Sequence, residues 1–263
     1  VYQPPVELNK FSGAAVMVES TAPNNEGTVQ AGWMVRMLTT LNSSFDMFPS
    51  QVSPSFYGDN RTHLFVAWSQ NKNGQHVGCH NLQCSGFVAI HNQHPISGSF
   101  DKVSVAGGQQ MYTELRVTKV IMNFIGVSII FLGLVIGDLF QDPETGDWWV
   151  TYYGVETKLG YFPNRLVSSL SNGGDVAAWG GITYSESGNS PPMGSGTYDR
   201  LNATKTANFI QTTANIRGSF NPPGKEDSVG VLDYSCYRAG ENKLLREGYT
   251  FLFGGPESPC TLR

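Results

Sequence analysis

Apolar and polar residues alternate with a period of two in several short stretches of this chain. Residues 28–35 place Val29, Ala31 and Trp33 on one side and polar or small residues on the other. After a turn at residues 142–147, Trp148 and Val150 fall on one face of a strand and Trp149 and Thr151 on the other. Because successive strand residues point to opposite faces, the pattern predicts half-buried strands. Further strands are predicted at 14–18, 61–69, 229–237 and 248–255.

Turn signals separate these stretches. They occur at residues 24–27, 58–60 and 71–74, and residues 167–170 predict one short helical turn. Charged residues make up only 14% of the 263 residues, with 30 glycines and 14 prolines, which suits many short strands joined by long loops. There is no internal repeat and no linker long enough to divide the chain. The sequence therefore predicts an all-β fold in a single domain spanning residues 1–263.

Charge and cysteine content indicate the compartment. A net charge of −4 gives no basic surface for nucleic acid. Four cysteines form two local pairs by spacing, and Asn42, Asn60 and Asn202 begin glycosylation sequons. Both features predict a secreted, extracellular protein. The sequence shows no signal peptide, so we expect a removed leader or a longer precursor.

Residues 120–137 are almost continuously apolar, bounded by Lys119 and Asp138. The length is at the short limit for a membrane span. A span here would cut a β-rich domain in two and separate its cysteine pairs across the bilayer. We therefore favour a buried core segment, or sequence added to the ancestral domain, over a membrane helix.

Several chemistries are disfavoured. The chain has no Gly-X-Ser-X-Gly elbow, and His80 adjoins a cysteine that we expect to be oxidised. His91 and His94 could approach a metal, but no third ligand stands at a recognisable spacing, so neither a metal site nor a cofactor is predicted. Four carboxylates lie nearest the predicted strands, each readily explained as a solvated charge: Asp59, Glu114, Glu156 and Glu186. The dense aromatic residues should be mainly core, with a minority lining a ligand groove.

Eight motifs in one order resemble the catalytic domain of the neprosin family of plant proteins. They are Ala-Gly-Trp at 31–33, Tyr-Gly-Asp-Asn-Arg-Thr at 57–62, the Cys-His-Asn-Leu-Gln-Cys segment within 78–88, Thr-Gly-Asp-Trp-Trp at 145–149, Gly-Tyr-Phe-Pro at 160–163, Trp-Gly-Gly at 179–181, Pro-Met-Gly-Ser-Gly at 192–196 and Phe-Gly-Gly-Pro at 253–256. The resemblance covers nearly the whole chain.

The resemblance implies a secreted glutamic peptidase that cleaves after proline and is made with an N-terminal propeptide. Its fold would be an antiparallel β-sandwich of two facing sheets, jelly-roll-like, with a long cleft that binds a proline-containing peptide. It also implies the disulfides Cys79–Cys84 and Cys236–Cys260. Trp33, Trp179 and Tyr184 are the candidate cleft residues.

The chain departs from the family at both catalytic positions. Gln30 stands where active members have the glutamate before Ala-Gly-Trp, and Ile182 where they have the glutamate after Gly-Gly. A Gln amide can orient water and donate to an oxyanion. Ile182 can neither activate water nor protonate a leaving amine. Glu186 is a weak substitute, because it keeps the facing of Ile182 but lies roughly 13 Å farther along a continuing strand.

Two intervals are longer than the family pattern, and we predict insertions at residues 36–52 and 119–137. We hypothesise that both are retained introns or misplaced exon edges. The sequence leaves three functions open: a peptidase working with Gln30 and another acid, a non-catalytic binder of proline-rich or cell-wall glycoprotein chains, and a lectin-like binder of glycans. The loss of the acid at Ile182 favours binding.

Overall fold

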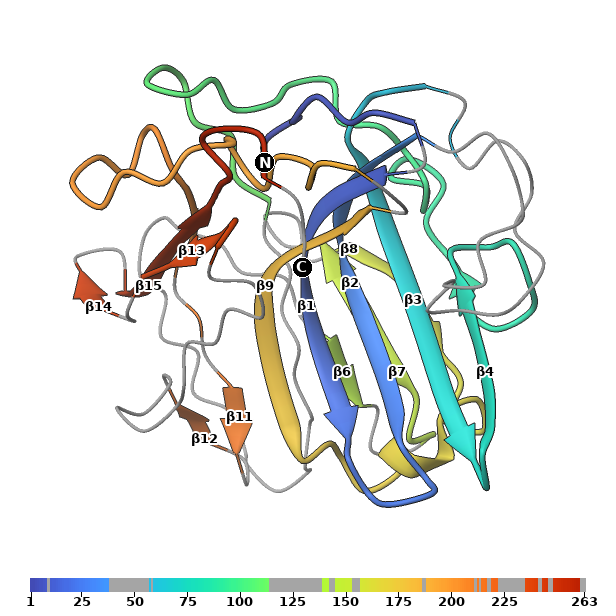
Figure 1. Ribbon diagram of the computed structural model, residues 1–263. Coiled ribbons are helices and arrows are strands. Elements are labelled where there is room, and N and C mark those ends of the chain that lie inside the picture. Colours follow the sequence, from blue (N-terminus) through green and yellow to red (C-terminus); the bar gives the residue numbers. More distant parts are fainter. Residues whose placement is uncertain are drawn as a thin grey trace.

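Most of the regular structure is antiparallel β-sheet, as the computed structural model shows (Figure 1). The described residues are 1–8, 10–37, 57, 59–113, 139–141, 145–152, 157–185, 188–210, 212, 214–216, 219–221, 235–240, 243–245 and 248–260. The predicted insertion at 119–137 and most of the one at 36–52 lie outside them. So does the strand predicted at 229–237, apart from its last residues.

The largest sheet has five strands in the order β4-β3-β2-β1-β9. Its strands are β1 (Lys10–Ser20), β2 (Gly27–Met37), β3 (His63–Lys72), β4 (Gln75–His80) and β9 (Val176–Ser185). The predicted strands at 14–18 and 28–35 are confirmed, and both extend farther than the alternation indicated. The predicted turn at 71–74 joins β3 to β4, with positive φ at Asn73 and Gly74, as a two-residue hairpin turn requires.

A second sheet has the order β5-β8-β7-β6. Its strands are β5 (Val88–Ala89), β6 (Leu139–Gln141), β7 (Trp148–Tyr152) and β8 (Thr157–Phe162). Trp148 and Val150 share a face as predicted, and the structure buries both in the core; their strand bulges after Val150. One hydrophobic cluster joins the two sheets, formed by Val18, Val29, Val66, Trp148, Leu159, Phe162 and their neighbours. The prediction of an all-β fold with facing antiparallel sheets is confirmed.

Smaller strands complete the fold. They are β10 (Ala207–Phe209), β11 (Ala214–Ile216), β12 (Ser219–Asn221), β13 (Arg238–Ala239), β14 (Lys243–Leu245) and β15 (Gly248–Gly254), and the predicted helical turn is a 3₁₀ helix at Ser168–Leu170. β10, β15 and β13 form a sheet whose Phe209, Phe251 and Phe253 cluster with Trp33 and Trp179 of the five-stranded sheet.

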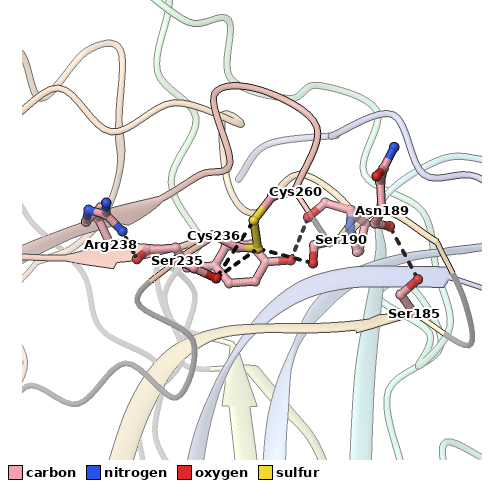
Figure 2. Close-up of a disulfide and its surroundings, with 9 residues drawn as sticks. Ser185, Asn189, Ser190, Ser235, Cys236, Arg238 and Cys260 are labelled. Atoms are coloured by element: carbon pink, nitrogen blue, oxygen red, sulfur yellow. Dashed lines mark hydrogen bonds between the residues drawn. A yellow bond between two sulfur atoms is a disulfide. The ribbon is translucent and has the colours of Figure 1, made fainter. Parts of the chain in front are cut away.

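Both predicted disulfides, Cys79–Cys84 and Cys236–Cys260, are present. The second fixes the chain that leaves β9 (Figure 2). The Ser190 amide donates to the Cys260 carbonyl at 2.6 Å, and the Tyr237 hydroxyl donates to the Pro191 carbonyl at 2.9 Å. Within the same loop, Ser185 Oγ donates to the Asn189 carbonyl at 3.3 Å. The position of the last β9 residues therefore depends on this crosslinked region.

The motif at 57–62 anchors the start of β3. The two ring nitrogens of His63 lie 2.7 Å from Asp59 Oδ1 and 2.8 Å from the Ser97 carbonyl oxygen. The His63 ring stacks on Tyr57 with centroids 3.9 Å apart. Arg61 donates to Asp59 through its backbone amide and its Nε. Burial acts to raise the pKa of Asp59, but hydrogen bonds from His63 and Arg61 outweigh it and lower the pKa to about 2.

We expect Asp59 to make stability depend on acidity. Because the folded state holds this carboxylate ionised below its ordinary pKa of 3.8, its contribution is full above pH 4 and is lost as the pH falls toward 2. Asp59→Asn should lower the free energy of unfolding at pH 6 by about 1–2 kcal/mol and reduce its fall between pH 4 and pH 2. Denaturant titrations at several pH values measure this. Asp101→Asn, an exposed acid, is the control, and an equal effect from both substitutions would contradict the assignment.

Two glycines, Gly32 of β2 and Gly180 of β9, lie in one row on either side of Ala15 of β1 and differ in the space around them. Ala15 of β1 pairs with Gly32 on one side and Gly180 on the other. A methyl group added at Gly32 would overlap the carbonyl oxygen of Ala14, whereas one added at Gly180 would meet no atom within 4 Å. Gly32 is therefore required for the close approach of β2 to β1, and Gly180 is not.

This contrast predicts opposite outcomes for one substitution at two sites. Gly32→Ala should reduce the free energy of unfolding by about 1–3 kcal/mol through overpacking. Gly180→Ala should leave it unchanged or raise it by up to about 1 kcal/mol, because alanine restricts the unfolded chain. Guanidinium unfolding of both variants and the natural chain provides the comparison. Equal destabilisation at both positions would show that the row is not packed as described.

Candidate functional site

The two positions that the family resemblance implies are catalytic lie on the same face of the five-stranded sheet. Gln30 of β2 pairs with Met17 of β1, and Ile182 of β9 pairs with Gly13 of β1. Positions 13 and 17 are four residues apart on one strand, so they share a facing, and antiparallel partners share it too. This face is opposite the one that packs on the second sheet, where Val18 and Val29 lie.

A row of small residues separates the two positions. It consists of Gly180, Ala15 and Gly32, side by side on β9, β1 and β2. Gln30 and Ile182 are about 13 Å apart along the strand direction and about 10 Å apart across two strands. Long side chains at both positions could therefore converge above this row. In this chain, an amide and an aliphatic group stand there.

Burial divides this face into two parts. Gln30 is only 4% exposed, and its neighbours toward β3 and β4 are buried as well, including Phe65, Ala67 and His80. Every residue of β9 is at least partly exposed, as are Phe11, Met17 and Glu19 of β1. Ile182 lies at the boundary, packed on a small cluster with Met34 and Phe65. Gln30 thus lies in the covered part of the face and Ile182 in the open part.

Two titratable side chains near Gln30 are held uncharged. His80 stands in the same cross-strand row, separated by Ala67, and its ring stacks on Phe65 with centroids 5.1 Å apart. Burial lowers the pKa of His80 well below its usual value, and the positive charge of Arg36 lowers it further. Burial likewise raises the pKa of Tyr57, whose hydroxyl accepts a hydrogen bond from Asn81 at 3.1 Å. At neutral pH, neither side chain supplies the charge that a glutamate would bring.

Glu19 is the single acidic residue among the described strand positions of this face. It pairs with Thr28 of β2, the residue two positions before Gln30, so it is a diagonal neighbour of Gln30 on the adjacent strand. The side chain is partly exposed. Glu19 was not among the site residues predicted from the sequence. The short turn at 24–27 allows Val18 to pair with Val29, which puts Glu19 opposite Thr28. Because Thr28 and Gln30 share a facing, this pairing would have placed Glu19 on the face of Gln30.

The three aromatic candidates separate between the two faces. Trp33 and Trp179 lie on the core side, where Trp33 is 6.1 Å from Phe209 between ring centroids and lines a small pocket with Tyr2, Ser12 and Phe253. Tyr184 shares the face of Gln30 and stacks on Phe11, with centroids 5.6 Å apart and planes 16° apart. Of the predicted cleft residues, only Tyr184 is on the side of the catalytic positions.

The remaining candidates are scattered. His91 and His94 stack 5.2 Å apart, and the His94 amide donates to His91 Nδ1. The described residues include no group of three or more His, Cys, Asp or Glu that could hold a metal ion. The Asp59 carboxylate is hydrogen-bonded to His63 and Arg61. The other candidate carboxylates, Glu114, Glu156 and Glu186, lie outside the described residues.

Two of the three predicted sequons lie within the described residues. Asn60 is exposed, and Asn202 Oδ1 accepts hydrogen bonds from the amide and hydroxyl of Thr204, while Asn42 is outside the described residues. No helix in the described parts of the chain is both long and apolar enough to span a bilayer. Residues 120–137 fall outside those parts.

Comparison with known families places the chain. The sequence model described as Neprosin matches residues 47–123 and 135–256, most of the chain. The break between the two matched blocks falls within residues 119–137. Ile182 lies inside the second block, and Gln30 precedes the first. With this match over an all-β fold, the chain belongs to the neprosin family.

Proposed function

We propose that this chain is a secreted neprosin-fold protein that binds extended, proline-containing segments of other proteins without cutting them. One observation carries the proposal. The two positions where the family resemblance implies glutamates share one face of the sheet, and they hold a buried amide and an aliphatic side chain. On this proposal, neither of the two positions carries a group that titrates near neutral pH.

Hydrolysis of a peptide bond needs one group to take a proton from water and one to give a proton to the leaving amine. The Gln30 amide could orient water or stabilise an oxyanion, but it exchanges no proton near neutral pH. Ile182 supplies neither function. A protein with these two residues lacks the proton transfers that a glutamic peptidase uses.

Binding a peptide requires no proton transfer, only an accessible surface of suitable chemistry, and the open part of the face provides one. It offers the stacked Phe11 and Tyr184 rings and a partly exposed apolar surface along β9. Proline-rich segments are extended before binding, so they lose little conformational entropy when they dock on aromatic surfaces. Two disulfides support a secreted location, since such bonds persist in oxidising compartments.

A peptidase remains the second candidate because Glu19 lies diagonal to Gln30. A Gln–Glu pair could in principle divide the roles of orienting water and exchanging protons. Glu19 is on β1 rather than β9, however, and lies beyond Gln30 from the row of small residues. It would not face Gln30 across that row, as a glutamate at position 182 would.

Restoring the acids tests the proposal. The natural chain should not cleave a proline-containing peptide at acid pH. Replacing both positions, Gln30→Glu with Ile182→Glu, should raise the rate at the post-proline bond by at least about 100-fold, since a positioned acid and base typically contribute that much. Ile182→Glu alone should give a smaller gain. Mass spectrometry of the products identifies the bond.

The control is Ala178→Glu, which adds an acid to the same strand and face but in the row of Gln30. It should produce no cleavage. Cleavage by the natural chain that disappears in Glu19→Gln would establish the peptidase candidate instead. Calorimetric titration with proline-rich and glycine-serine peptides tests binding separately, and a glycan array tests whether sugars are the ligand.

A further inference from the structure

The partly exposed area of the candidate face forms a continuous band along the sheet. It consists of Phe11, Met17 and Glu19 of β1 together with the alternate residues of β9 from Val176 to Tyr184, and it is called the open strip below. β9 is the outermost strand of its sheet among the described residues. All ten of its residues are partly exposed or exposed, whereas most of β1 beside it is buried.

The two ends of the open strip differ in chemistry. At one end, Phe11 and Tyr184 stack on each other, and the Arg36 guanidinium carbon lies 5.8 Å from the Phe11 ring centroid. At the other end stands the Glu19 carboxylate, which makes no hydrogen bond or ion pair with the described residues. One end is thus aromatic and the other anionic.

The middle of the open strip is apolar. Ala178, Gly180 and Ile182 line it on β9, and no strand residue in it is charged. The space above Gly180 is clear, since a methyl group added there would meet no atom within 4 Å. A ligand backbone can therefore approach the sheet closely between the two ends.

The distance between the two ends of the open strip sets the length of the peptide segment that can contact both. Phe11 and Glu19 are eight residues apart on one strand, which corresponds to about 26 Å at about 3.3 Å per residue. A polyproline II segment advances about 3.1 Å per residue, so it covers this distance in eight or nine residues.

We propose that the open strip binds an extended segment of another protein in which a proline and a basic residue stand eight or nine positions apart. The proline ring packs on Phe11 and Tyr184, and the Lys or Arg side chain pairs with Glu19. This rests on the proposed binding function and specifies its ligand. Charge complementarity at one end and ring packing at the other select this ligand over an uncharged proline-rich chain.

A series of synthetic peptides tests the spacing. Each contains one proline-rich core and a single Lys placed four, eight or twelve residues from it, and an uncharged peptide has Gln in its place. The natural chain should bind the eight-residue spacing about two- to fivefold more tightly than the others, the range expected for one exposed ion pair. Fluorescence anisotropy at low and high salt measures the affinities, and salt should remove the preference.

Two variants test the roles proposed for the two ends of the open strip. Glu19→Gln should abolish the preference among spacings, and Asp101→Asn, an exposed acid outside the sheet, should change neither that preference nor the affinity for the uncharged peptide. Tyr184→Leu should weaken every peptide by a similar factor. Equal affinity for all spacings would overturn this inference and leave the binding function standing. Failure of every peptide to bind would overturn the binding function itself.

Discussion

The pairing of β1 on both of its sides is the constraint on which the rest of the structure depends. It runs antiparallel to β2 over eleven residues and to β9 over ten, with no bulge on either side. Because strand side chains alternate, this register decides the face of every residue on three strands at once. A shift of β2 by one residue against β1 would turn Gln30 toward the core and Val29 away from it, and the same shift of β9 would turn Ile182 toward the core.

The same register explains how the fold tolerates an amide at Gln30 and an aliphatic side chain at Ile182. Gln30 and Ile182 lie opposite the main core, so neither contributes to the contact between the two large sheets. A change from an acid to an aliphatic residue at position 182 removes a proton carrier and adds apolar contact with Met34 and Phe65. If the proposed loss of catalysis is right, stability favours an apolar residue at position 182, because an acid there would be costly to bury beside Met34 and Phe65.

Much of the fold could be predicted from the sequence, because alternation at 28–35 and 148–152 reports a physical period. The candidate site was harder to predict from the sequence. Trp33 was predicted from its residue type, but it packs on Phe209, because alternation says which residues share a face and not which face is covered. Glu19 was missed for a related reason: its importance comes from the β1–β2 register, and residues 14–18 alone did not show that the strand continues to Ser20.

The long separation between β1 and β9 affects how the protein is made. β1 pairs with β2 after a short turn, but its other edge pairs with β9, which follows about 160 residues later. At ordinary translation rates, synthesis of these residues takes on the order of 10–30 s. Throughout that interval the nascent chain presents an open apolar strand edge, the kind of surface that recruits chaperones or neighbouring chains on a polysome. The sheet that carries the candidate site therefore has an edge that is exposed to misassembly during synthesis.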